Sequence, residues 1–182
     1  MKKQRWIIRA VCIFILLAWM IWIIDANVAL WGYKKVEYFF GDPGPVVSEL
    51  QPVARLGPKE TLEGKRSYQK MFEDPTYFDL ITPVTYRRAK LKLYFRNDTN
   101  IPLRIGIRWD SKSNYKLYDL IKDGEEDGWT VAKAEIDMTS ARYENGKYRF
   151  VLSAPGLVRG NPDRYIALSS IVIELYKDPI YK

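Results

Sequence analysis

A group of residues in the middle of the chain combines the side chains that a sugar-binding site needs. Aromatic rings stack on the apolar faces of sugar rings, and neighbouring polar groups hydrogen-bond to the hydroxyls. The set is Tyr94, Trp109, Asp110, Tyr115 and Trp129. Trp109 shares the parity of the apolar residues in its run, and Trp129 begins another run. Packing at the core or its rim is therefore an alternative role for both.

Basic side chains form a second candidate site. In residues 88–97 and 103–110, Lys and Arg alternate with apolar residues, which predicts a hairpin with one apolar and one basic face. The basic set is Arg88, Lys90, Lys92, Arg96, Arg104 and Arg108. Such a face binds an anionic polymer or anionic headgroups, or it is a solvated strand surface that resists edge pairing. Both alternatives stay open.

The residue types needed for most catalysis are missing. The chain has no His, and its single Cys12 lies in an apolar stretch, which excludes Ser-His-Asp and Cys-His catalysis and most zinc sites. Among carboxylates such as Asp79 and Glu174, no pair stands out as that of a glycoside hydrolase. The acidic run 123–127 lacks EF-hand spacing and reads as a solvated turn. We expect a non-enzymatic protein with no catalytic residues, no metal and no cofactor.

Short alternating runs between turn residues position these candidates. Strands are expected at 77–81, 88–97, 103–109, 115–121, 129–136, 147–153 and 165–176. Asn97 begins one predicted hairpin turn and Asn145-Gly146 another. A bulge is expected at Ser169-Ser170, where the apolar parity slips. The pattern predicts an all-β fold, an antiparallel β-sandwich over residues 61–182.

Residues 25–60 precede the predicted sandwich. The stretch 41–60 contains Pro43, Pro45, Pro52 and Pro58. Because proline restricts φ and lacks a backbone donor, this stretch is neither a helix nor a central strand. Two alternatives remain: an extended spacer, or an arm ordered along the surface of the domain.

Residues 6–24 are apolar apart from Arg9. At about 1.5 Å rise per residue they span about 28 Å, close to the ~30 Å hydrocarbon core of a bilayer. Trp6, Trp19 and Trp22 suit the two interfaces, and the basic tail 1–5 predicts a cytoplasmic N-terminus and an extracytoplasmic domain. We expect one transmembrane helix in the cell membrane. A cleaved signal peptide is the alternative, although no good cleavage site follows.

Several segments together resemble a jelly-roll module. They are residues 78–80, the turn at Asn97, Trp129, and residues 146–150, 153–157 and 171–175. Galactose-binding-like and carbohydrate-binding domains share this layout. With its apolar N-terminal stretch, the chain also resembles uncharacterised single-pass membrane proteins of candidate-phyla bacteria. The resemblance implies glycan binding and sometimes a structural calcium ion, and it transfers no binding residue by position.

These observations predict a membrane-anchored interaction module of the cell envelope, with a structural or adaptor role toward a protein partner. The alternative is a carbohydrate-binding module for a cell-surface or environmental glycan. The net charge of +7 is partly due to the basic N-terminal tail, so we expect no nucleic-acid partner.

Overall fold

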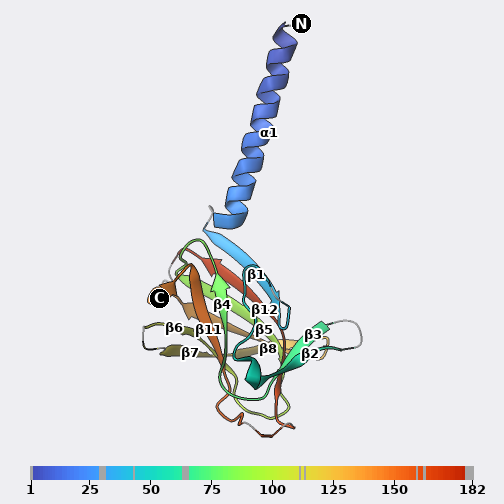
Figure 1. Ribbon diagram of the computed structural model, residues 1–182, viewed down its shortest axis with the longest axis vertical. Helices are drawn as coiled ribbons and strands as arrows, with labels where there is room; N and C mark the ends of the chain where they lie inside the picture. The colour runs from blue at the N-terminus through green and yellow to red at the C-terminus, as the bar shows by residue number, and fades with distance from the viewer. Residues whose placement is uncertain are drawn as a thin grey trace.

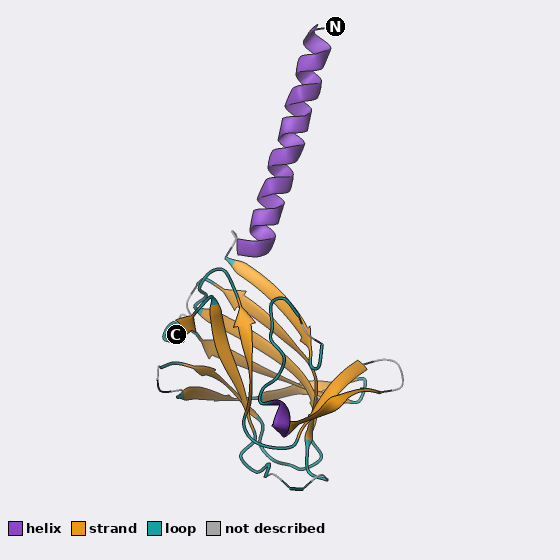
Figure 2. Cartoon of the chain, in the orientation of Figure 1, coloured by secondary structure: helices purple, strands orange, loops and turns teal. Residues whose placement is uncertain are grey.

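Two antiparallel β-sheets follow one N-terminal helix (Figure 1, Figure 2). Sheet A has seven strands: β1 (Tyr33–Phe39), β2 (Leu56–Leu62), β3 (Arg66–Met71), β5 (Arg88–Arg96), β8 (Ile121–Glu126), β9 (Trp129–Asp137) and β12 (Ile166–Tyr176). Sheet B has five: β4 (Thr76–Ile81), β6 (Arg104–Arg108), β7 (Tyr115–Asp119), β10 (Tyr143–Glu144) and β11 (Lys147–Ser153). The helices are α1 (Lys2–Val28) and the 3-10 turn η1 (Val53–Arg55).

The computed structural model describes residues 2–28, 32–42, 44–62, 66–110, 112, 114–158, 160–161 and 163–178. Within α1, the side chains of residues 6–7 and 9–23 are described.

β12 is the central strand of sheet A. It pairs with β5 on one side, and with β3 and then β1 on the other, in the order β2-β3-β12-β5-β9-β8. Most of its apolar residues are buried, as expected for a central strand of a sandwich. The register shifts between Leu168 and Ser170, which confirms the bulge predicted there. The bulge lets residues on both sides of the parity slip face the core.

β11 has the same role in sheet B. It pairs with β4 on one side and with β6 on the other, and β7 lies beyond β6 at the edge. Phe78 of β4 and Phe150 of β11 face sheet A and stack with ring centroids 5.4 Å apart. Each is fully buried, which contributes roughly 1.5–3 kcal/mol per side chain. Inward burial of alternate residues leaves the others on the outward face of each sheet.

The predicted hairpin between residues 88–97 and 103–109 is wrong. β5 pairs with β12 and β9 in sheet A, whereas β6 pairs with β11 and β7 in sheet B. The segment between them crosses the sandwich and is held by Asn97, whose Nδ2 donates to the Ile101 carbonyl at 2.7 Å. The expected strand 115–121 is likewise divided at Leu120, where the chain passes from β7 to β8. Alternation of apolar and polar residues identifies the buried face of a strand, but it does not identify the sheet to which the strand belongs.

The proline-containing stretch 41–60 agrees with the ordered arm and not with the free spacer. The backbones of Gln51 and Tyr77 exchange two hydrogen bonds of 2.8 Å, so the arm lies along β4. Val47 and Leu50 of the arm are 2% and 1% exposed. The arm, β1 and β2 together place much of residues 25–60 in the sandwich. The core therefore includes residues that precede residue 61, where the sandwich was expected to begin.

The helix α1 stands clear of the two sheets (Figure 1). Its described apolar side chains are exposed on all sides, and so is Arg9. Trp6 is 73%, Trp19 59% and Trp22 66% exposed. In the described part of the chain, however, no helix has both the length and the apolar character needed to cross a membrane. The transmembrane span predicted for residues 6–24 lies within α1.

Candidate functional site

The outward face of sheet B brings two tyrosines together with charged residues from several strands. Tyr77 and Asp79 of β4 point outward because Phe78 between them points into the core. By the strand register, Arg149 of β11 lies opposite Asp79, and Arg108 of β6 lies opposite Tyr115 of β7. We call this surface the tyrosine face.

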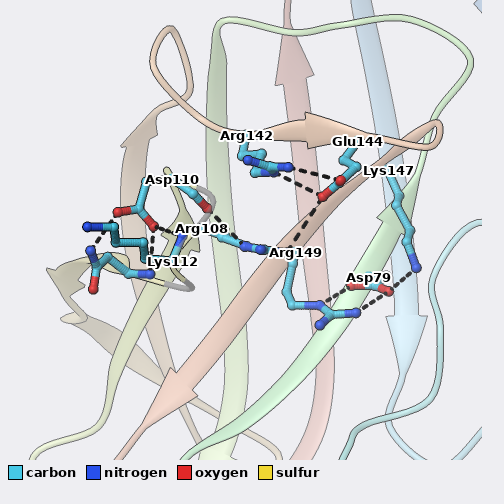
Figure 3. Close-up of polar contacts among 9 residues, drawn as sticks. Asp79, Arg108, Asp110, Lys112, Arg142, Glu144, Lys147 and Arg149 are labelled. Carbon is cyan, nitrogen blue, oxygen red and sulfur yellow. Dashed lines mark hydrogen bonds and ion pairs between the residues drawn. The ribbon is translucent and has the colours of Figure 1, made fainter.

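On the tyrosine face, the Asp79 carboxylate accepts hydrogen bonds from two cationic side chains (Figure 3). Arg149 donates from Nε and Nη2 at 2.7 and 3.0 Å, and Lys147 donates from Nζ at 2.6 Å. Burial alone would raise the pKa of Asp79, but these hydrogen bonds lower it below its ordinary value. Arg149 also lies over the ring of Tyr77, with its Cζ 4.6 Å from the ring centroid. The ring and the carboxylate together fix the guanidinium.

Glu144 forms a second shared ion pair beside the first. Arg142 donates to it from Nε and Nη2, both at 2.9 Å, and Nη1 of Arg108 lies 3.7 Å away. The hydrogen bonds from Arg142 lower the pKa of Glu144. These residues, with those around Asp79, line a hollow of about 30 Å³, the size of one water molecule. The hollow is a polar recess between two ion-pair clusters.

Three of the predicted ligand residues lie together at the turn between β6 and β7. The Trp109 amide donates to the Asn114 carbonyl, and Asp110 accepts from the amides of Lys112 and Asn114 at 2.9 Å each. The Trp109 side chain is 50% exposed, so its ring lies at the surface and not in the core. Tyr115 is half-buried, and burial raises its pKa while the nearby positive charges oppose that shift.

The other two predicted ligand residues, Tyr94 and Trp129, lie on the outward side of sheet A. Tyr94 is 8% and Trp129 1% exposed. The ring of Tyr68 packs on Trp129 at 5.8 Å, and the Arg96 guanidinium lies 4.6 Å from the Trp129 ring centroid. These rings are covered, so they serve packing and offer no stacking surface.

The predicted basic face is divided between the two sheets. Arg104 and Arg108 belong to sheet B, and the other members belong to β5 of sheet A. Lys92 of β5 pairs with Glu126 at 3.4 Å, and Arg104 pairs with Asp119 at 2.8 Å. A single continuous basic surface therefore does not form, because the hairpin that would have created it does not exist.

A wider hollow of about 640 Å³ lies on the outward side of sheet A. Across it, the register alternates basic and acidic residues: Lys35, Glu174, Lys90 and Glu135. Cross-strand pairs of opposite charge stabilise a solvated sheet face. With its aromatic residues covered, this surface has fewer features of a binding site than the tyrosine face.

The acidic run expected as a turn at 123–127 lies mostly in β8, and only its end forms the turn before β9. Asp123 pairs with Lys133 and Glu125 with Lys122, each at 2.8 Å. Among the described residues, no group of His, Cys, Asp and Glu is arranged to hold a metal ion.

The ion-pair residues Asp79, Lys147 and Arg149 were not among the ligand residues expected from the sequence. Their signal is a single acidic residue, Asp79, inside the apolar run 77–81. A carboxylate placed among buried residues needs a cationic partner. Arg149, its main partner, lies 70 positions away along the chain, so only strand pairing identifies it.

Comparisons with known proteins identify the fold and no family. The chain matches no known family and no curated protein sequence. It is similar to the xylan-binding CBM22-1 domain of Xyn10C from Paenibacillus barcinonensis, with a TM-score of 0.50 at 9% identity, covering 79% of this chain and 94% of that domain.

Two further carbohydrate-binding modules are similar with lower scores. They are the C-terminal CBM6 of the laminarinase LamC from Zobellia galactanivorans (TM-score 0.45, 11% identity, 77% and 98% coverage) and a β-1,3-glucan-binding CBM6 from Bacillus halodurans (0.41, 14%, 77% and 94%). At such identities the likeness to CBM22-1 shows the fold alone. It supports the two-sheet, jelly-roll β-sandwich predicted from the sequence.

Proposed function

We propose that the protein is a carbohydrate-binding module whose ligand lies on the tyrosine face. The observation that carries this proposal is the arrangement there of Tyr77 and Tyr115 beside fixed hydrogen-bonding groups, with the exposed Trp109 at the adjoining turn between β6 and β7. Aromatic rings with a polar rim match the alternating apolar and hydroxylated surfaces of a sugar. The shared fold with a xylan-binding domain adds support.

Calorimetric titration of the full chain in detergent with soluble xylan and β-1,3-glucan tests this proposal. We expect binding to at least one polysaccharide, and Tyr115→Ala should weaken it about tenfold or more, equivalent to ~1.4 kcal/mol. Tyr33→Ala is the matched control, since Tyr33 is 43% exposed on sheet A. Failure of the full chain to bind any polysaccharide, or equal losses in the two variants, contradicts the proposal.

The adaptor role expected from the sequence has less support than glycan binding, because the similar structures are carbohydrate-binding modules. It remains the alternative. Capture of a defined protein partner by a chain that binds no glycan would favour it.

We further propose that α1 attaches the sandwich to a lipid bilayer, with the N-terminus cytoplasmic and the sandwich extracytoplasmic. The supporting observation is the exposure of apolar residues around α1, such as Phe14 at 73% and Trp22 at 66%. An exposed apolar surface of this kind is typical of a membrane or protein contact. The basic residues of the N-terminal tail favour the cytoplasmic side.

Carbonate extraction of cells that express the full chain tests this attachment. We expect the protein to stay with the membranes and a chain lacking residues 1–31 to leave them. Protease added to intact cells should digest the sandwich. Release of the full chain by carbonate contradicts the attachment, and protection of the sandwich contradicts its orientation.

A further inference from the structure

The tyrosine face carries more cations than carboxylates. Four basic residues, Arg108, Arg142, Lys147 and Arg149, surround Asp79 and Glu144 at the small hollow (Figure 3). A third carboxylate, that of Asp110 at the turn between β6 and β7, interacts electrostatically with Arg108 and Arg142. Counting it, four cations face three carboxylates, so the cluster keeps a net positive charge.

The carboxylates of the cluster are already engaged as acceptors. Asp79 accepts three hydrogen bonds from Lys147 and Arg149, and Glu144 accepts two from Arg142. Asp110 accepts three more, all from residues of its own turn. The two guanidinium groups that bond Asp79 and Glu144 each donate through Nε and one Nη, and a guanidinium has further N–H groups. A ligand here therefore meets donors and positive charge.

Two of the cations are also held in position. Arg149 is fixed between the Asp79 carboxylate and the Tyr77 ring, and Arg142 is fixed by its two bonds to Glu144. A fixed planar guanidinium binds a planar carboxylate with little loss of side-chain freedom. The side chains of Arg142 and Arg149 are about one-third exposed, so solvent and ligands reach them.

We propose, on the basis of the glycan-binding function above, that the ligand is an acidic glycan whose sugars carry carboxylates, that is, uronic acid residues. The tyrosines contact the sugar rings, and Arg142 and Arg149 contact the carboxylates. Sulfated glycans offer the same negative charge on a tetrahedral group, which a guanidinium fork also binds, so a sulfated polymer is the competing ligand.

Titration of the full chain in detergent with neutral xylan, with xylan bearing glucuronic acid and with dextran sulfate tests the proposal. We expect the acidic xylan to bind at least about tenfold more tightly than the neutral one, and this preference should shrink as salt rises. Arg142→Gln should lower the affinity for acidic xylan toward that for neutral xylan. Arg149→Lys keeps the charge and loses the planar fork, so it should lower that affinity as well.

Arg104→Gln is the control, because Arg104 lies on the same sheet but pairs with Asp119 away from the hollow. Melting temperatures confirm that the variants fold. Equal affinities for neutral and acidic xylan overturn this inference and leave glycan binding intact. Binding of dextran sulfate as tight as that of acidic xylan, with Arg149→Lys tolerated, overturns the carboxylate preference. Binding to no glycan removes the function itself.

Discussion

Asp79 accepts three charge-assisted hydrogen bonds, although its side chain is only 11% exposed. Its partners are more exposed, at 40% for Lys147 and 31% for Arg149. Solvent therefore screens the cations more than the carboxylate. Loss of the carboxylate leaves Lys147 and Arg149 without their shared partner.

Asp79→Asn should lower the free energy of unfolding by about 1–2 kcal/mol at neutral pH, measured by urea denaturation. Since the pKa of Asp79 is lowered in the folded state, its stabilisation is present above the unfolded pKa of about 3.9 and is lost as pH falls through the folded pKa. The difference between variant and parent should shrink below about pH 4. Asp119→Asn, at a carboxylate 80% exposed, should cost less than about 0.5 kcal/mol. Equal effects would contradict the central role of Asp79.

At the scale of elements, Gly106 lies in β6, between β11 and the edge strand β7 of sheet B. The absence of a side chain at Gly106 allows residues of both neighbouring strands to approach its Cα closely. A Cβ at this position would lie 2.7 Å from Leu117 Cδ2 and 2.8 Å from the Lys116 carbonyl oxygen. It would also lie 3.0 Å from Val151 Cγ1. Because one neighbour is backbone, a side-chain rotation cannot relieve the clash. The edge strand β7 would have to move, and Tyr115 with it.

Gly106→Ala should therefore destabilise the protein by roughly 1–3 kcal/mol in chemical denaturation and weaken polysaccharide binding as well. Gly44→Ala is the control, because a Cβ there makes only an ordinary contact, 3.6 Å from the Val47 carbonyl oxygen. Wild-type stability of Gly106→Ala would show that β7 adjusts freely.

At the scale of the whole molecule, the two sheets enclose tyrosines as well as aliphatic residues. Tyr38 is 4% and Tyr86 1% exposed. Burial, with smaller contributions from nearby groups, raises the pKa of each to about 12. The Tyr86 hydroxyl is buried and has no hydrogen-bond partner among the described residues. An ionised phenolate is therefore incompatible with the closed sandwich.

Stability should be constant up to about pH 10, the unfolded pKa of tyrosine, and should fall as pH rises to about 12. The folded state holds these protons more tightly than the unfolded state, so deprotonation favours unfolding. Thermal unfolding followed by circular dichroism from pH 8 to 12 measures the loss. Tyr86→Phe should retain stability at pH 7 and lose less of it in alkali. An unchanged alkaline loss in Tyr86→Phe would exclude Tyr86 as a cause.

Strand positions were largely predictable because alternation is a local property. The expected strand 147–153 matches β11, and the parity slip at Ser169-Ser170 matches the bulge in β12. Pairing was not predictable in the same way. The run 88–97 has the same pattern whether it pairs with β6 or with β12, and only the closed sandwich excludes the first.

The sequence by itself determined the all-β class, the outward or inward direction of most strand residues, and the presence of Trp109 and Tyr115 near one turn. The tertiary structure decided that Tyr94 and Trp129 are covered, that the basic residues divide between two sheets, and that Asp79 meets Arg149. The physical reason is the separation along the chain of the residues that each property involves. Side-chain alternation follows from the geometry of a single strand, whereas contacts between strands far apart in the chain depend on how two sheets bury a common core.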